Sequence, residues 1–162
     1  MKVLDIMTRN VKFCGPDTNL AEATEILWRN DCGALPVLDS GRELIGLVTD
    51  RDICIALGTR NCRASELDVR QVAMKPVFTC TPNNDVHDAL QTMRQHQVRR
   101  VPVVGEDGKL KGILCLDEIV LHAEQARGPG ILYEDVVNTM KAICERRAKE
   151  APKAATMAGV VL

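Results

Sequence analysis

The chain alternates between short apolar runs and stretches in which apolar residues recur at helical spacing. Runs at 11–14, 35–38 and 44–48 are typical of strands, and turn residues at 39–42 join the last two into a hairpin. Asn19 followed by Glu22 predicts the start of a helix. The helix continues through apolar positions spaced three or four apart, namely Leu20, Ala23, Ile26 and Leu27. A second helix is expected after Val48, ending near Gly58.

The same order of elements returns 66 residues later. Aligning 11–57 with 77–123 without a gap gives nine identities, among them the prolines at 36 and 102 and the glycines at 46 and 112. Asp85 takes the helix cap, followed by Val86, Ala89, Leu90 and Met93 on the apolar side. The repeat predicts an α+β fold of two βαββα units. Each unit is too small to be stable alone, so both should pack as one body with a groove between them.

These patterns divide the chain into three parts: repeat 1 at 1–62, repeat 2 at 63–124, and a remainder at 125–162. The remainder should contain a linker, a helix at 131–148 and a flexible tail. One face of that helix is apolar, with Val136, Met140, Ile143 and Cys144, and the other carries Lys141, Glu145, Arg146 and Arg147.

Composition narrows the class of protein. The 162 residues carry a net charge of −1 and no basic block, which disfavours electrostatic binding to nucleic acid or to an anionic membrane. No apolar run reaches membrane-spanning length and no signal peptide is present, so we expect a cytoplasmic protein. The seven cysteines lack metal or disulfide spacing and should be buried or half-buried free thiols, and the three histidines do not pair with them at zinc spacing.

The chemistry-bearing segment is Thr49-Asp-Arg-Asp52, at a strand-to-helix junction. One interpretation is a capping box in which Thr49 and Asp52 satisfy each other's backbone N–H groups. The other is a ligand site, because a helix N-terminus suits a phosphate and a carboxylate can accept from two ribose hydroxyls. Local sequence alone leaves both open.

The ordered motifs, given twice, resemble the tandem cystathionine beta-synthase (CBS) domain pair, also called a Bateman module. The matching segments are 5–8, 35–39, 46–53, 72–74, 99–104 and 112–119, within about residues 1–124. The resemblance implies two repeats related by pseudo-twofold symmetry and a C-terminal helix added to them. It also implies that the clefts between repeats bind an adenosyl compound (AMP, ADP, ATP, S-adenosylmethionine or an NAD-like dinucleotide) as a regulatory ligand rather than a catalytic cofactor.

Carried onto this chain, the resemblance predicts one better site around Thr49, Arg51 and Asp52. Three cations near its mouth should favour a phosphate-bearing ligand. The cleft's remaining residues are expected to be Met74, Lys75, Val77, Val98, Arg99, Arg100 and Pro102.

The symmetric cleft departs from the family pattern, because Cys115 and Glu118 replace the Thr and Asp. A thiol is a weak donor and a poor cap, and Glu is one methylene longer. The opposite wall lacks cations, so this site should be weaker, empty or differently selective. Cys115 is either filler or a redox-sensitive thiol. The opposite wall of this cleft is expected to contain Met7, Thr8, Cys32, Gly33, Ala34 and Pro36.

No catalytic motif is present, so we expect a non-enzymatic sensor that signals to an unknown effector protein. The alternative is a ligand-free interaction protein with vestigial clefts. Apolar residues on the helices predict a homodimer in either case, with the C-terminal helix a possible added contact. Those residues are Ile26, Leu27, Trp28, Leu90 and Met93.

Overall fold

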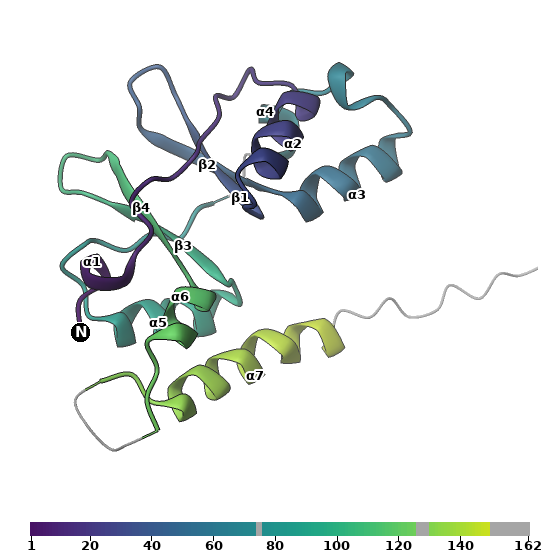
Figure 1. Ribbon diagram of the computed structural model, residues 1–162. Helices are drawn as coiled ribbons and strands as arrows, with labels where there is room; N and C mark the ends of the chain where they lie inside the picture. Colours follow the sequence, from purple (N-terminus) through teal and green to yellow (C-terminus); the bar gives the residue numbers. More distant parts are fainter. Residues whose placement is uncertain (74–75, 126–129, 150–162) are drawn as a thin grey trace, which may run out of the picture.

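The computed structural model describes residues 1–73, 76–125 and 130–149 (Figure 1). The predicted tail and part of the predicted linker lie outside these residues. The elements, in chain order, are α1 (Val3–Ile6), α2 (Leu20–Arg29), β1 (Ala34–Leu38), β2 (Leu44–Thr49), α3 (Asp50–Arg60), the short 3-10 helix η1 (Ala64–Glu66), α4 (Arg70–Ala73), α5 (Val86–His96), β3 (Arg100–Val104), β4 (Leu110–Cys115), α6 (Leu116–Leu121) and α7 (Tyr133–Lys149).

Two antiparallel hairpins form the centre of the molecule, β1 with β2 and β3 with β4 (Figure 1). Their registers correspond: Pro36 lies opposite Leu47, and Pro102 lies opposite Ile113. Both hairpins also carry a register shift at the same place, after Val37 and after Val103. The predicted α+β fold of two repeats is therefore confirmed.

The first strand expected in each repeat is reduced to one bridge. Cys14 pairs in parallel with Val37, and Cys80 with Val103. The Cys14 N–H donates to the Pro36 carbonyl at 3.1 Å, and its carbonyl accepts from Leu38 at 2.9 Å. A Pro lies two residues after each cysteine and has no N–H for a ladder, so pairing stops there. The predicted strands at 11–14 and 77–80 were wrong in length.

Each of the two hydrophobic clusters includes residues from the chain segment that precedes the other repeat. Val3 and Ile6 of α1 belong to the cluster of repeat 2, whereas Leu67, Val69 and Ala73 belong to that of repeat 1. The segment between α1 and α2 therefore runs from one repeat to the other (Figure 1). This crossing places N-terminal residues beside the groove between the repeats. The boundary at 62/63 stays a prediction.

The predicted helix caps are present. Asn19 accepts from the Glu22 N–H at 2.9 Å, and Asp85 accepts from the His87 N–H at 2.9 Å. Helix α3 passes through Gly58 and ends at Arg60. The predicted end near Gly58 lies two residues before the observed one, since a glycine inside a helix costs only about 1 kcal/mol, which packing offsets.

Helix α7 packs along α5, in the lower part of Figure 1. Val136 and Ile143 are buried and Met140 is half-buried, as the apolar face predicted. Cys144 is exposed, so its place on that face was wrong. No helix among the described residues is long and apolar enough to cross a membrane.

Helix α7 covers apolar residues of α5 that would otherwise remain at the surface. Leu90 and Met93, expected to leave hydrophobic surface, are fully buried, and Leu27 is buried as well. Trp28 on α2 is 85% exposed. Apolar surface therefore stays exposed on α2 of repeat 1, because within the described chain no helix equivalent to α7 lies over α2.

Candidate functional site

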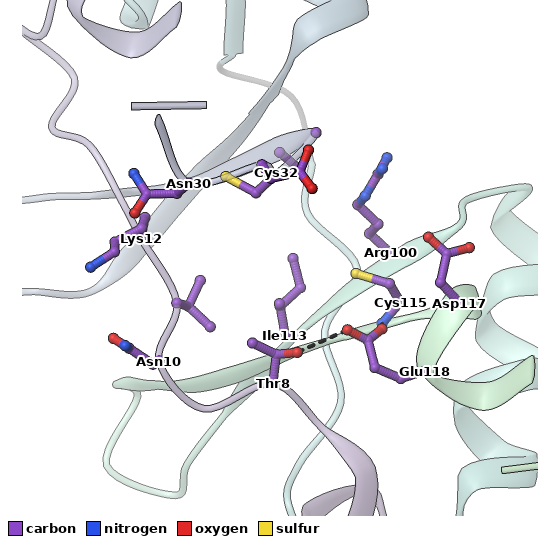
Figure 2. A pocket seen from close by; sticks show the side chains of 14 residues that line it. Thr8, Asn10, Lys12, Asn30, Cys32, Arg100, Ile113, Cys115, Asp117 and Glu118 are labelled. Atoms are coloured by element: carbon purple, nitrogen blue, oxygen red, sulfur yellow. Dashed lines mark hydrogen bonds between the residues drawn. The ribbon is translucent and has the colours of Figure 1, made fainter. Parts of the chain in front are cut away.

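A cleft of about 440 Å³ opens between the repeats (Figure 2). Three parts of the chain meet there: the N-terminal segment, the end of α2 with the start of β1, and the β4–α6 junction. The lining residues are Thr8, Asn10, Val11, Lys12, Asn30, Asp31, Cys32, Gly33, Ala34, Arg100, Ile113, Cys115, Asp117 and Glu118. This cleft is the one predicted to be the weaker site.

Glu118 lines the cleft, and two donors hold its carboxylate. Its Oε1 accepts from the Thr8 hydroxyl at 2.8 Å, and its Oε2 accepts from the Cys115 N–H at 2.9 Å (Figure 2). The first bond joins the N-terminal segment to α6. Each carboxylate oxygen has a further lone pair, so a fixed acceptor remains for hydroxyl groups of a ligand.

The pKa values of both cysteines of this cleft are raised above that of an ordinary thiol. Burial, followed by the nearby Glu118 carboxylate, raises the pKa of Cys115 to about 12. Burial also raises the pKa of Cys32. The Ala34 backbone N–H and the positive charge of Arg100 lower it, but burial has the larger effect. Since the thiolate is the reactive form, the filler interpretation of Cys115 is favoured over the redox one.

Two cations line the cleft, whose opposite wall was expected to lack cations. Lys12 comes from the N-terminal segment, and Arg100 begins β3. In Figure 2, Lys12 lies at the left of the cleft and Arg100 lies above Glu118. Arg100 lies against Gly33, where a Cβ would come within 2.8 Å of its Nη2. The prediction placed Arg100 at the other cleft; the structure brings it to this one.

Of the other residues predicted here, Thr8, Gly33 and Ala34 line the cleft. Met7 and Pro36 are not among its lining residues. Met7 packs against Gly112 instead, and Pro36 is buried within β1. Pro36 shares its strand face with Ala34 but lies two residues farther along β1.

The Thr49–Asp52 pair forms the predicted capping box at the start of α3. Thr49 Oγ1 accepts from the Asp52 N–H at 3.1 Å, and Asp52 Oδ2 accepts from the Thr49 N–H at 3.2 Å and from its hydroxyl at 2.6 Å. Arg51, directly before Asp52 in the first turn of α3, is exposed. The predicted capping box is therefore present.

The expected wall opposite Thr49 is described in part. Val77 and Val98 are half-buried and Pro102 is buried in β3, whereas Met74 and Lys75 lie outside the described residues. Arg99 is half-buried, and its Nε is buried with no hydrogen-bond partner among the described residues. Side chains alternate along an extended segment, so Arg99 points away from the Arg100 side.

Comparison with known proteins identifies the family. The family model for the CBS domain matches residues 3–59 and again 69–124. The chain belongs to the CBS domain family. The CBS domain-containing protein YhcV of Bacillus subtilis is 34% identical over 120 residues, which cover 74% of this chain and 84% of YhcV. Hypoxic response protein 1 of Mycobacterium tuberculosis is 31% identical over 144 residues, covering 89% and 94%.

Solved structures of CBS proteins share the fold. The crystal structure of Hypoxic Response Protein I with two coordinated zinc ions matches this CBS pair at a TM-score of 0.69 and 31% identity, covering 76% of this chain and all of that one. The structure of CBSX2 in complex with AMP matches at 0.63 and 27%, covering 74% and 93%. Within the described part of this CBS pair, no group of three or more His, Cys, Asp or Glu side chains could hold a metal ion.

Several residues of the cleft were not predicted: Asn10, Val11, Lys12, Asn30, Asp31, Ile113 and Asp117. Those of the N-terminal segment carry no motif, and only the crossing of that segment between the repeats brings them in. Ile113 could have been found from strand parity, since it lies two residues before Cys115 on β4.

Proposed function

We propose that this CBS pair is a regulatory, non-catalytic module that binds an adenosyl compound between its repeats and signals to another protein. The observation that carries the proposal is the cleft of about 440 Å³ to which both repeats contribute. Its size lies within the range of small-ligand sites. The complex of CBSX2 with AMP supports the class of ligand.

The lining residues suit the parts of such a ligand. Glu118, fixed by Thr8 and by the Cys115 N–H, would accept hydrogen bonds from ribose hydroxyls. Lys12 and Arg100 would attract a phosphate. Val11, Ala34 and Ile113 offer apolar contact to a base. This assignment favours a nucleotide such as AMP, ADP or ATP over S-adenosylmethionine, which has no phosphate.

The cleft at Thr49 and Asp52 remains a proposed second site. Asp52 holds the position equivalent to Glu118, and the buried Nε of Arg99 has an N–H to offer a ligand acceptor. The prediction ranked this cleft first because Thr49 and Asp52 match the family pattern and because three cations, Lys75, Arg99 and Arg100, were expected at its mouth. With Arg100 lining the other cleft, we now rank the Glu118 cleft first.

Signalling is proposed to occur through a homodimer and an effector protein of unknown identity. On α2 the exposed Trp28 lies beside an apolar groove that includes Leu27, Ile53 and Leu57. At the equivalent face of repeat 2, α7 of the same chain packs over α5. The face of repeat 1 is therefore the proposed dimer surface. A ligand would shift assembly only by binding one arrangement of the repeats better than another.

The proposed location is the cytoplasm. All seven cysteines are free thiols, and two of them, Cys54 and Cys144, are exposed rather than buried as expected. Exposed free thiols persist best in a reducing compartment.

The experiment is a thermal-shift series with AMP, ADP, ATP, S-adenosylmethionine and NAD on the wild type, Glu118→Ala and Asp52→Ala. A dose-dependent rise with a phosphate-bearing ligand, lost in Glu118→Ala, supports the proposal, because only a binder stabilises by mass action. A rise lost only in Asp52→Ala assigns binding to the other cleft. No response from ligand-free wild-type protein would favour the alternative, a structural homodimer with vestigial clefts.

A further inference from the structure

A second concavity, of about 220 Å³, lies where the two hairpins meet the N-terminal segment. Four cationic residues line it: Arg9 after α1, Arg42 in the turn between β1 and β2, and Lys109 and Lys111 on the second hairpin. We call it the cationic pocket. The bridge between Glu43 and Lys109 joins the hairpins here. Figure 1 shows both hairpin turns on the side away from α3 and α7.

The positive charges of the cationic pocket are held largely by neutral groups. The Arg9 guanidinium donates to the Leu4 carbonyl at 2.9 Å, and that of Arg42 lies 4.9 Å from the centroid of the Phe13 ring. Lys111 forms an ion pair with Asp107 at 2.8 Å. No acidic side chain is among the lining residues. The side chains are thus positioned while most of their charge stays available to an anion.

The backbone at Arg42 is in the left-handed region, with φ of +64°. The residue 66 positions later is Gly108, with φ of +72°. Glycine adopts this conformation without a steric cost, whereas a side chain such as that of Arg is disfavoured. The first hairpin therefore keeps a cation at a turn position for which glycine is the better residue, and such strain often accompanies function.

The repeat also supplies an internal comparison. At the same offset, Lys109 corresponds to Glu43, Lys111 to Ile45, and Phe13 to Thr79. Both hairpins nevertheless form with the same register. The cations and the ring beneath Arg42 are therefore not required by the hairpin fold, and they occur at one of the two equivalent positions.

We propose that the cationic pocket binds a compact oligophosphate, either free pyrophosphate or the phosphates of a nucleotide. Its volume is below the range of sites that enclose a whole drug-sized ligand, so it suits the phosphates alone. The pocket is separate from the Glu118 cleft, although Val11 of the N-terminal segment lines both. The proposal does not depend on adenosyl binding in that cleft.

The test is isothermal titration calorimetry with sodium pyrophosphate, ATP and adenosine at low ionic strength, where screening is weak. The variants are Arg42→Gly, which removes the cation and relieves the backbone, and Lys109→Glu, which installs the residue of the other repeat. Arg29→Ala is the matched control, because it removes an exposed cation on α2.

The proposal predicts that the wild type binds pyrophosphate. Arg42→Gly and Lys109→Glu should bind it at least tenfold more weakly, and Arg29→Ala should bind it as tightly as the wild type does. The melting temperature of Arg42→Gly should not fall. An equal loss for ATP identifies nucleotide phosphates as ligands, and a loss for pyrophosphate alone identifies the free anion. Equal binding by Arg42→Gly and wild type, an equal loss in Arg29→Ala, or no binding of millimolar pyrophosphate would overturn the proposal.

Discussion

Gly112 on β4 is where the N-terminal segment packs most closely on the second hairpin, and replacing it with Ala tests that contact. A Cβ there would lie 2.7 Å from the Thr8 carbonyl oxygen and 2.9 Å from Met7 Sδ. The backbone of Thr8 must then move, and it exchanges two hydrogen bonds of 3.0 Å with Ile113. Overpacking together with weakened hydrogen bonds should cost about 2–4 kcal/mol.

Urea unfolding followed by circular dichroism measures this loss, and the melting temperature should fall by roughly 4–16 °C. Gly58→Ala is the control, since a Cβ there meets nothing within 4 Å and the residue lies inside α3. It should raise stability by about 1 kcal/mol. A loss below roughly 0.5 kcal/mol for Gly112→Ala would refute the close approach of Thr8. Destabilisation by Gly58→Ala would refute a continuous α3.

Three further predictions concern single side chains. Hydrogen bonds, first from the His87 N–H, lower the pKa of Asp85 to about 2. Asp85→Ala should lower the free energy of unfolding by about 1 kcal/mol at pH 7. In acid titrations of stability, this difference from wild type should shrink as the pH falls from about 4 to about 2. Iodoacetamide at pH 8 should modify the exposed Cys54 at least tenfold faster than Cys115, whose pKa of about 12 keeps it protonated; equal rates in peptide mass spectra would contradict this. Trp28→Arg should weaken the proposed homodimer at least tenfold in sedimentation equilibrium, and a monomeric wild type would remove the basis for that surface.

The repeat, its hairpins and its caps could be predicted because local chemistry determines them. Asn19 and Asp85 cap their helices whatever lies around them, and both hairpins follow their turn residues. The first strands were predicted too long, because an apolar run near a Pro does not reveal how many partners it finds.

Predictions that depended on tertiary packing fared less well. Leu90 and Met93 are buried because α7 returns over α5, a contact that no local pattern specifies. Arg100 was expected at the Thr49 cleft and lines the Glu118 cleft, because the resemblance to the family gave its position along the strand but not the face it occupies. Lys12 was missed because it reaches the cleft only through the crossing of the N-terminal segment.

The most direct measurement of the central claim is a calorimetric titration of AMP into the wild type and into Glu118→Ala at matched concentrations. The account predicts saturable binding by the wild type and at least a tenfold loss in Glu118→Ala, about 1.4 kcal/mol. It also predicts that the variant stays folded by circular dichroism. Undiminished binding by a folded Glu118→Ala protein would contradict the assignment of the ligand to this cleft.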